Sequence, residues 1–158
     1  MRIAKRQLAG SGEALPAGAI GETISVIGTT QAVITTTSGA FSTTLAQCNL
    51  KPGVWMLIPF IHGKENAGYT GTVRFGAVLS TSPTASWFVG AAITDGQVGI
   101  TLSNISGSAA EFSQDVAGLP LFVNVSAETI YYLRGTSFNN LSTGSIVFLG
   151  AIKALRIA

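Results

Sequence analysis

The side chains that most often carry out catalysis or bind metals are few in this sequence and widely separated. One histidine (His62), one cysteine (Cys48) and seven acidic residues occur in 158 residues. A metal site built on histidine or cysteine needs several such ligands at fixed spacing. Glycoside hydrolysis needs two carboxyl groups about 5–10 Å apart. Glu111 and Asp115 are the candidate pair, but solvated loop acids are the simpler interpretation of both residues. We therefore predict no enzymatic activity, no cofactor and no metal.

Other patterns that could carry chemistry also have simpler explanations. No phosphate-binding loop of the Gly-x-x-x-x-Gly-Lys type is present, and the glycines at positions 10 and 12 belong to a linker. Cys48 lies in an alternating apolar and polar run, which predicts a small buried side chain. Trp55 is expected in the core. Trp87 follows a Ser-Pro-Thr turn and is the best candidate for an aromatic that stacks on a ligand.

The composition indicates a chain that assembles with other copies or with a partner. Charged residues make up 10% and hydrophobic residues 47% of the sequence, against a usual charged share of about 25%. A membrane-spanning helix needs roughly 20 consecutive apolar residues, and the longest such run, residues 53–61, is far shorter. We predict no membrane insertion and no signal peptide, and we attribute the low charge to buried subunit contacts.

The formal net charge of +2 is concentrated near the amino terminus. Three cationic residues precede the first acid, and the segment continues in Gly, Ser, Ala and Pro, which predicts a flexible arm over residues 1–21. A short basic arm lacks the broad basic face that duplex recognition requires, so no nucleic-acid partner is expected. The arm is expected to anchor the protein to a partner through Arg2, Ile3, Lys5, Arg6 and Leu8.

Residues 22–158 form the second predicted unit, an all-β domain. Thr, Val, Ile and aromatic residues occur in short runs separated by Gly, Asn, Ser and Pro, without an apolar repeat of helical period. The pattern is typical of an antiparallel β-sandwich, and we expect a jelly-roll-like one. Asp95-Gly96 and Asn139-Asn140 are expected turns. The expected strands are residues 22–28, 32–37, 40–48, 54–62, 71–80, 86–91, 98–103, 119–125, 129–138 and 145–157.

Two of these strands are apolar on both faces. Residues 54–61 and 145–157 carry hydrophobic side chains at odd and even positions alike, so the second face of each strand also needs a cover. Three sandwiches around a shared axis could supply that cover, and we expect a homotrimer. Pro59 predicts an edge position or a bulge. The residues expected at the subunit contacts are Val54, Met56, Ile58, Phe60, Val147, Leu149 and Leu155.

Four further stretches form an ordered series over residues 15–157. Residues 15–22 (LPAGAIGE) lead into the first expected strand, and residues 50–55 (LKPGVW) open a central strand with a Gly-x-Trp step. Residues 76–84 (GAVLSTSPT) combine a strand with a Ser/Thr turn. The fourth stretch consists of residues 131–138 (YYLRGTSF) followed by 150–157 (GAIKALRI), and it resembles a closing hairpin. In this order they resemble the β-sandwich head module at the carboxyl termini of many bacteriophage tail-fibre and related virion proteins.

The resemblance implies a homotrimeric, non-enzymatic structural protein of a bacteriophage particle. Such a protein is assembled in the host cytoplasm and exposed on the virion for contact with the host surface. Its implied partners are further copies of itself, virion proteins of the tail, portal, collar or capsid bound through the arm, and a host-surface glycan or protein. Tail fibres usually carry a long attachment and shaft region, whereas a short arm precedes the head here. The alternative is therefore a capsid decoration or head-fibre protein at a vertex; more distant alternatives are a carbohydrate-binding module and a small hydrolase.

Overall fold

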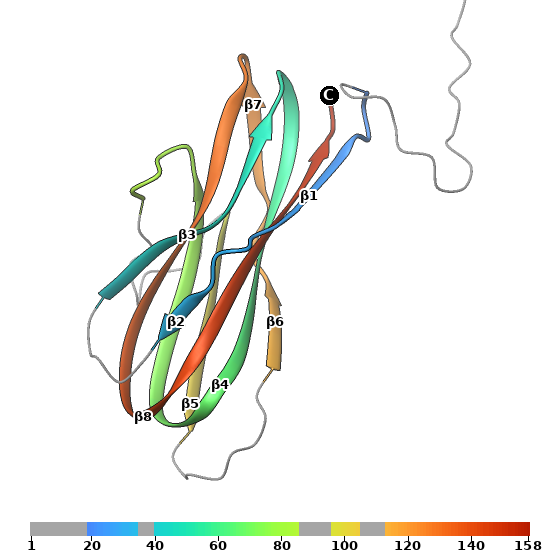
Figure 1. Ribbon diagram of the computed structural model, residues 1–158. Helices are drawn as coiled ribbons and strands as arrows, with labels where there is room; N and C mark the ends of the chain where they lie inside the picture. Colours follow the sequence, from blue (N-terminus) through green and yellow to red (C-terminus); the bar gives the residue numbers. More distant parts are fainter. Residues whose placement is uncertain (1–18, 35–39, 86–95, 105–112) are drawn as a thin grey trace, which may run out of the picture.

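All regular elements in the described residues are β-strands, and every strand pairing is antiparallel (Figure 1). The computed structural model describes residues 19–34, 40–85, 96–104 and 113–158. This confirms the predicted all-β, antiparallel class. The strands are β1 (Thr23–Ile27), β2 (Ala32–Ile34), β3 (Ala40–Leu50), β4 (Gly53–Ser80), β5 (Gln97–Asn104), β6 (Ser113–Ala117), β7 (Leu121–Val125) and β8 (Thr129–Arg156).

Two long strands form the centre of the sheet. β4 and β8 contain 28 residues each and pair with one another from Trp55 opposite Arg156 to Ser80 opposite Tyr132. The shorter strands line the two outer edges of this pair. β1, β2 and β3 pair with β8, and β5, β6 and β7 pair with β4.

Both long strands reverse their direction at one end of the molecule, as Figure 1 shows. The register between them shifts three times between Glu65 and Gly71. Gly71 has φ +123° and Gly144 has φ +79°, a backbone region that glycine enters without the steric cost that a Cβ brings. The strands therefore bend without losing their partner.

The bend divides the sheet into two parts that face each other. We call β3, residues 129–138 of β8, residues 71–80 of β4 and β5 the first half-sheet. The second half-sheet consists of β1, β2, residues 146–156 of β8, residues 53–64 of β4, β6 and β7. Each half-sheet thus has an inner face toward the other and an outer face away from it.

The core lies between the two inner faces. Phe75 of the first half-sheet and Phe148 of the second stack with ring centroids 4.0 Å apart and an angle of 5° between the rings. A Cβ placed on Gly150 would lie 2.5 Å from the Cβ of Leu45, so the two backbones approach closely at this point. The other large side chains with less than 2% exposure are Trp55, Leu50, Leu57, Ile61, Val73, Val98, Leu133, Ile146 and Ile152.

Several sequence-based expectations differ from the structure. Residues 54–62 and 71–80 were expected as separate strands, as were 129–138 and 145–157, but each pair is one continuous strand. The predicted turn at Asn139-Asn140 is wrong, because these residues lie within β8 opposite Val73 and Thr72. β6 was not expected. The strand expected at residues 86–91 and part of the one at 32–37 lie outside the described residues.

The prediction that Pro59 marks an edge strand or a bulge is wrong. Pro59 lies in the interior strand β4, and the register with β8 is regular on both sides of it. The N–H of Gly118 donates to the carbonyl of Pro59 at 2.8 Å. The two backbone groups of one strand residue point to the same side. The side of Pro59 that lacks an N–H therefore faces the junction between β6 and β7 and leaves the ladder with β8 intact.

Candidate functional site

The residues expected at subunit contacts lie on the outer face of the second half-sheet. Side chains alternate between the faces of a strand, and cross-strand partners share a face. Met56 lies opposite Leu155, Phe60 opposite Ala151, and Leu149 opposite His62. All seven of the predicted contact residues lie on this face: Val54, Met56, Ile58, Phe60, Val147, Leu149 and Leu155.

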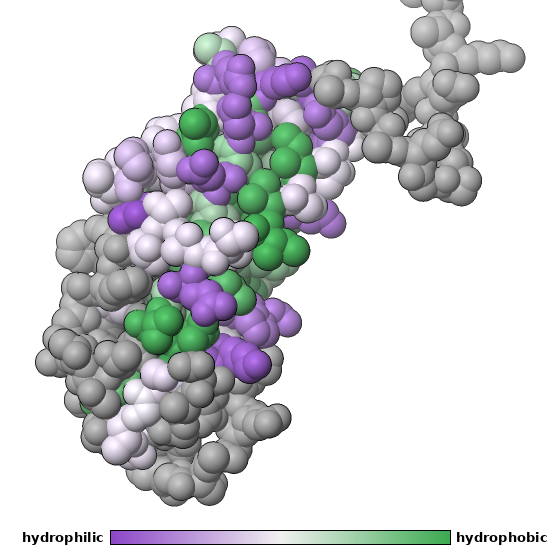
Figure 2. Space-filling model, in the orientation of Figure 1, coloured by the Kyte–Doolittle hydropathy of each residue, from purple (hydrophilic) through white to green (hydrophobic). Residues whose placement is uncertain are grey.

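Neighbouring strands extend the same apolar surface. Ile27 of β1 lies opposite Ala151, Val33 of β2 opposite Val147, and Phe122 of β7 opposite Met56. Their exposed fractions are 79%, 45% and 61%, respectively. We call these three residues, Ala151 and the seven predicted contact residues the apolar face. In the view of Figure 2, hydrophobic side chains gather near β1 and β2, with hydrophilic ones between them.

The outer face of the first half-sheet has a different character. Arg134 lies on this face and donates from Nη1 to Oγ1 of Thr44 at 2.7 Å. Val78, Ile130 and Tyr132 share the face with these polar residues. We call this surface the polar face; its polar side chains are Thr44, Gln47, Asn49, Thr72, Arg74, Ser80, Gln97, Arg134 and Thr136.

A few charged groups interrupt the apolar face. Lys153 of β8 lies opposite Ile58 on one side and Ser25 on the other, and its side chain is exposed. His62 of β4 and Asp115 of β6 form a hydrogen bond with 2.8 Å between Nδ1 and Oδ1. The side chain of Asp115 remains 85% exposed in this pair. Lys64 of β4 lies opposite Val147 and is also exposed. The described part of this face thus carries two lysines and one aspartate.

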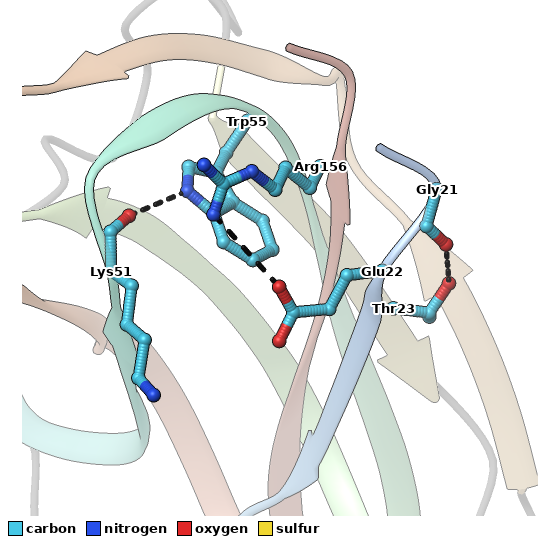
Figure 3. A network of polar contacts seen from close by, with 6 residues as sticks. All are labelled: Gly21, Glu22, Thr23, Lys51, Trp55 and Arg156. Atoms are coloured by element: carbon cyan, nitrogen blue, oxygen red, sulfur yellow. Dashed lines mark hydrogen bonds and ion pairs between the residues drawn. The ribbon is translucent and has the colours of Figure 1, made fainter. Parts of the chain in front are cut away.

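The end of β8 and the start of β1 are joined by a polar cluster (Figure 3). The guanidinium carbon of Arg156 lies 5.7 Å from the ring centroid of Trp55, within the range of cation–π attraction. Oε2 of Glu22 lies 4.0 Å from Nη1 of Arg156, and both side chains are about 15% exposed. Nε1 of Trp55 donates to the carbonyl of Lys51 at 2.9 Å.

Backbone hydrogen bonds hold the same place. The N–H of Gly21 donates to the carbonyl of Arg156 at 2.8 Å, and the N–H of Arg156 donates to the carbonyl of Glu22 at 2.9 Å. The N–H of Val54 also donates to the carbonyl of Ala158 at 2.7 Å. Residues 19–22 are therefore fixed beside the last residues of the chain.

Cys48 has the buried position expected from its alternating pattern, with 2% of its surface exposed. Burial raises the pKa of its thiol to about 11, although a backbone hydrogen bond at Tyr131 lowers it. The pKa of Tyr131 is also raised, first by burial and then by the nearby Cys48. A thiol with a raised pKa is protonated at neutral pH and is a poor nucleophile.

The remaining predicted site residues lie outside the described part of the chain: Arg2, Ile3, Lys5, Arg6, Leu8, Trp87 and Glu111. Asp115 is described, and its partner is His62. Among the described residues, no group of three or more His, Cys, Asp and Glu side chains could hold a metal ion. Sequence reasoning missed the pair of His62 and Asp115, because the two residues are 53 positions apart and belong to strands whose pairing was unknown.

The comparisons with known proteins found no relative. No protein-family model matches the sequence, and neither the curated proteins nor the solved structures gave a significant match. Within the described residues, no helix has the length and apolar character needed to cross a membrane.

Proposed function

We propose that the chain is a non-enzymatic structural protein of a bacteriophage particle and assembles as a homotrimer. In this proposal residues 22–158 form a jelly-roll-like sandwich head, and residues 1–21 form an arm that anchors the head to another virion protein. The head is exposed for contact with the host surface. The observation that carries the proposal is the apolar face.

The apolar face supports assembly on energetic grounds. Burial of apolar surface contributes about 25 cal/mol per Å², and a stable interface of standard size buries about 800 Å² per partner. Exposed apolar patches beyond a few hundred Å² on a soluble protein commonly mark interaction sites. Ile27, Val33 and Phe122 add exposed apolar side chains on β1, β2 and β7 beside the predicted contact residues. The facing half-sheets, joined by continuous strands, support the sandwich architecture.

The place on a phage particle is supported by the four stretches that resemble tail-fibre head modules. The anchoring role of the arm is supported by its junction with the head. Residues 19–22 are tied to the end of β8 by two backbone hydrogen bonds and by the pair of Glu22 and Arg156. A tension applied through the arm is thereby transmitted to the central strands of the sheet.

The oligomeric state is the first test. Sedimentation equilibrium at micromolar concentration should give three times the 16.2 kDa of the chain. Leu149→Asp or Leu155→Asp on the apolar face should dissociate the trimer, because each buries a charge in the contact. Val78→Asp on the polar face is the matched control and should sediment as the wild type. A stable wild-type monomer would overturn the proposed assembly.

The second test addresses the particle. Deletion of residues 2–12 should leave a folded trimer that no longer joins particles during assembly in infected cells. Labelling of the full-length protein in purified particles should decide between the tail and the capsid, where a decoration or head-fibre role would place it. Unchanged incorporation of the truncated protein would contradict the anchoring role of the arm.

A further inference from the structure

β1 packs little of its surface against the rest of the head. Among the described strands, it pairs with β8 alone, over five residues. Its side chains alternate between exposed and half-buried, so none of them is fully buried. Ile24 and Val26 pack against the core and are only partly buried there. Little apolar burial therefore opposes a separation of β1 from β8, and elements of this kind open locally at a low cost in free energy.

The part of the chain that can separate ends before Gly28. The N–H of Gly28 donates to the carbonyl of Gly150 at 2.9 Å, and a Cβ on Gly28 would lie 1.7 Å from the carbonyl oxygen of Leu45. Gly28 thus contacts both β8 and β3. β2 follows and pairs with β8, with Ala32 fully buried. The chain is therefore held from residue 28 onward, independently of β1.

The start of β1 is held by three side chains, Glu22, Trp55 and Arg156, which we call the clasp (Figure 3). The guanidinium carbon of Arg156 lies 5.7 Å from the ring centroid of Trp55, and Nη1 of Arg156 lies 4.0 Å from Oε2 of Glu22. Trp55 is fully buried, so the guanidinium rests against the core. A Cβ on Gly53 would lie 2.7 Å from the guanidinium carbon, and the glycine leaves the room that Arg156 needs. Through the clasp, the core holds the residue that precedes β1.

Burial makes the clasp stronger than an ion pair at the surface. The side chains of Arg156 and Glu22 are 15% and 14% exposed, so water and salt screen their attraction less than that of an exposed pair. If Glu22 left the sheet together with β1, the largely buried guanidinium would lose this carboxylate, which is unfavourable. The clasp therefore opposes the separation of β1 from β8 more than the burial of β1 itself does.

We propose that the clasp controls the release of β1. While the clasp is closed, β1 stays paired with β8; when it opens, residues 19–27 leave the sheet together and the rest of the head stays folded. β1 is then a releasable continuation of the arm. Release moves the end of the arm from residue 21 to residue 27, which adds about 20 Å of extended chain. The release depends only on the fold, whereas the use of this added reach rests on the proposed anchoring role of the arm.

Native-state hydrogen exchange of the purified full-length protein tests this control. Peptides covering residues 20–27 should exchange faster than those covering residues 55–61 of β4, because an element that opens separately exchanges without global unfolding. Glu22→Gln should speed exchange in residues 20–27 roughly five- to tenfold. Lys153→Gln is the matched control, because it removes a charge of β8 that lies opposite Ser25 of β1, outside the clasp. It should change neither rate.

Two further variants test whether the fast exchange comes from β1 leaving β8. Phe75→Ala weakens the core and leaves the clasp intact, so it should speed exchange in residues 55–61 but not in residues 20–27. Ser25→Cys combined with Lys153→Cys places two thiols opposite each other, within the range of a disulfide. The oxidised form should slow exchange in residues 20–27, and the reduced form should not.

The outcomes separate the release of β1 from the proposed assembly. Equal exchange of the two regions in the wild type would mean that β1 opens only with the whole head, and would overturn the release. Equal effects of Glu22→Gln and Lys153→Gln would mean that the clasp does not control it. All variants are compared at one protein concentration, and sedimentation checks that they share one oligomeric state. A monomeric wild type with the expected exchange pattern would support the release and overturn the assembly.

Discussion

The two half-sheets are built largely from the same two strands, yet their outer faces differ in character. Residues 71–80 of β4 place Thr72 and Arg74 outward, whereas residues 53–64 place Met56, Ile58 and Phe60 outward. The inner faces of both are apolar and share one core. The core is therefore built from the inner faces of both half-sheets, whereas the apolar outer side chains are confined to one of them. Under the proposed assembly, that outer surface is the one covered by other copies.

The largest effect on stability is expected from removing the aromatic contact between the two half-sheets. Phe75→Ala deletes one ring of the stacked pair with Phe148 and leaves a cavity between the inner faces. We expect the free energy of unfolding to fall by about 3–5 kcal/mol, measured by urea denaturation. Phe122→Ala on the apolar face should lower the free energy of unfolding of the dissociated chain by less than about 1 kcal/mol. Equal losses would contradict the assignment of inner and outer faces.

The close approach of the two backbones gives the next largest effect. Gly150→Ala places a Cβ 2.5 Å from the Cβ of Leu45 and 2.9 Å from Cδ2 of Leu133. The half-sheets must separate to admit it, and we expect a loss of about 1–3 kcal/mol. Ala151→Val, one residue later on the apolar face, is the control and should change stability by less than about 0.5 kcal/mol. A neutral Gly150→Ala variant would show that the inner faces are looser than described.

Arginines on the two half-sheets should also behave differently. Arg156→Ala removes the cation–π contact with Trp55 and the ion pair with the largely buried Glu22. We expect the free energy of unfolding to fall by about 1–2 kcal/mol. Arg74→Ala removes an exposed side chain of the polar face and should change stability by less than about 0.5 kcal/mol. Thermal melts of both variants at the same protein concentration would compare them. A similar melting temperature for the two would argue against the cluster as a stabilising element.

The smallest effect is a dependence on pH within the first half-sheet. The pKa of Cys48 rises from its usual 9.0 to about 11 on folding, so above pH 9 the unfolded chain releases a proton that the folded chain retains. The free energy of unfolding should therefore fall as the pH rises from about 9 to 11, by about 1 kcal/mol at pH 10. Cys48→Ala should reduce this slope and leave the smaller part that Tyr131 contributes. An unchanged slope would exclude Cys48 as its source.

The apolar face could be predicted from the sequence, whereas its charged groups could not be placed. Residues 54–61 are apolar at both parities, and a period of two alone assigns Met56, Ile58 and Phe60 to one face. The hydrogen bond between His62 and Asp115 depends on the pairing of β4 with β6. Strand pairing is a tertiary property, and local residue types do not encode it.

The continuity of β4 and β8 through the bend could not be predicted from the local sequence either. Residues 63–70 are polar and rich in glycine, which is typical of a turn. In the structure this stretch continues to pair with β8, with shifts of register, up to Thr70 opposite Thr143. The backbone ladder supplied by the partner strand overrides the local preference.

The position of β8 in the chain has a consequence for how the molecule folds. β1, β2, β3 and β4 all pair with β8, although residues 23–80 leave the ribosome before residues 129–156. Until then these strands lack their main partner, and their hydrogen-bonding edges remain open to other chains. Pairings between residues so distant in the sequence also form slowly, because a long loop must close first. We expect slow refolding, and a nascent chain that depends on protection from aggregation until its last strand has been made.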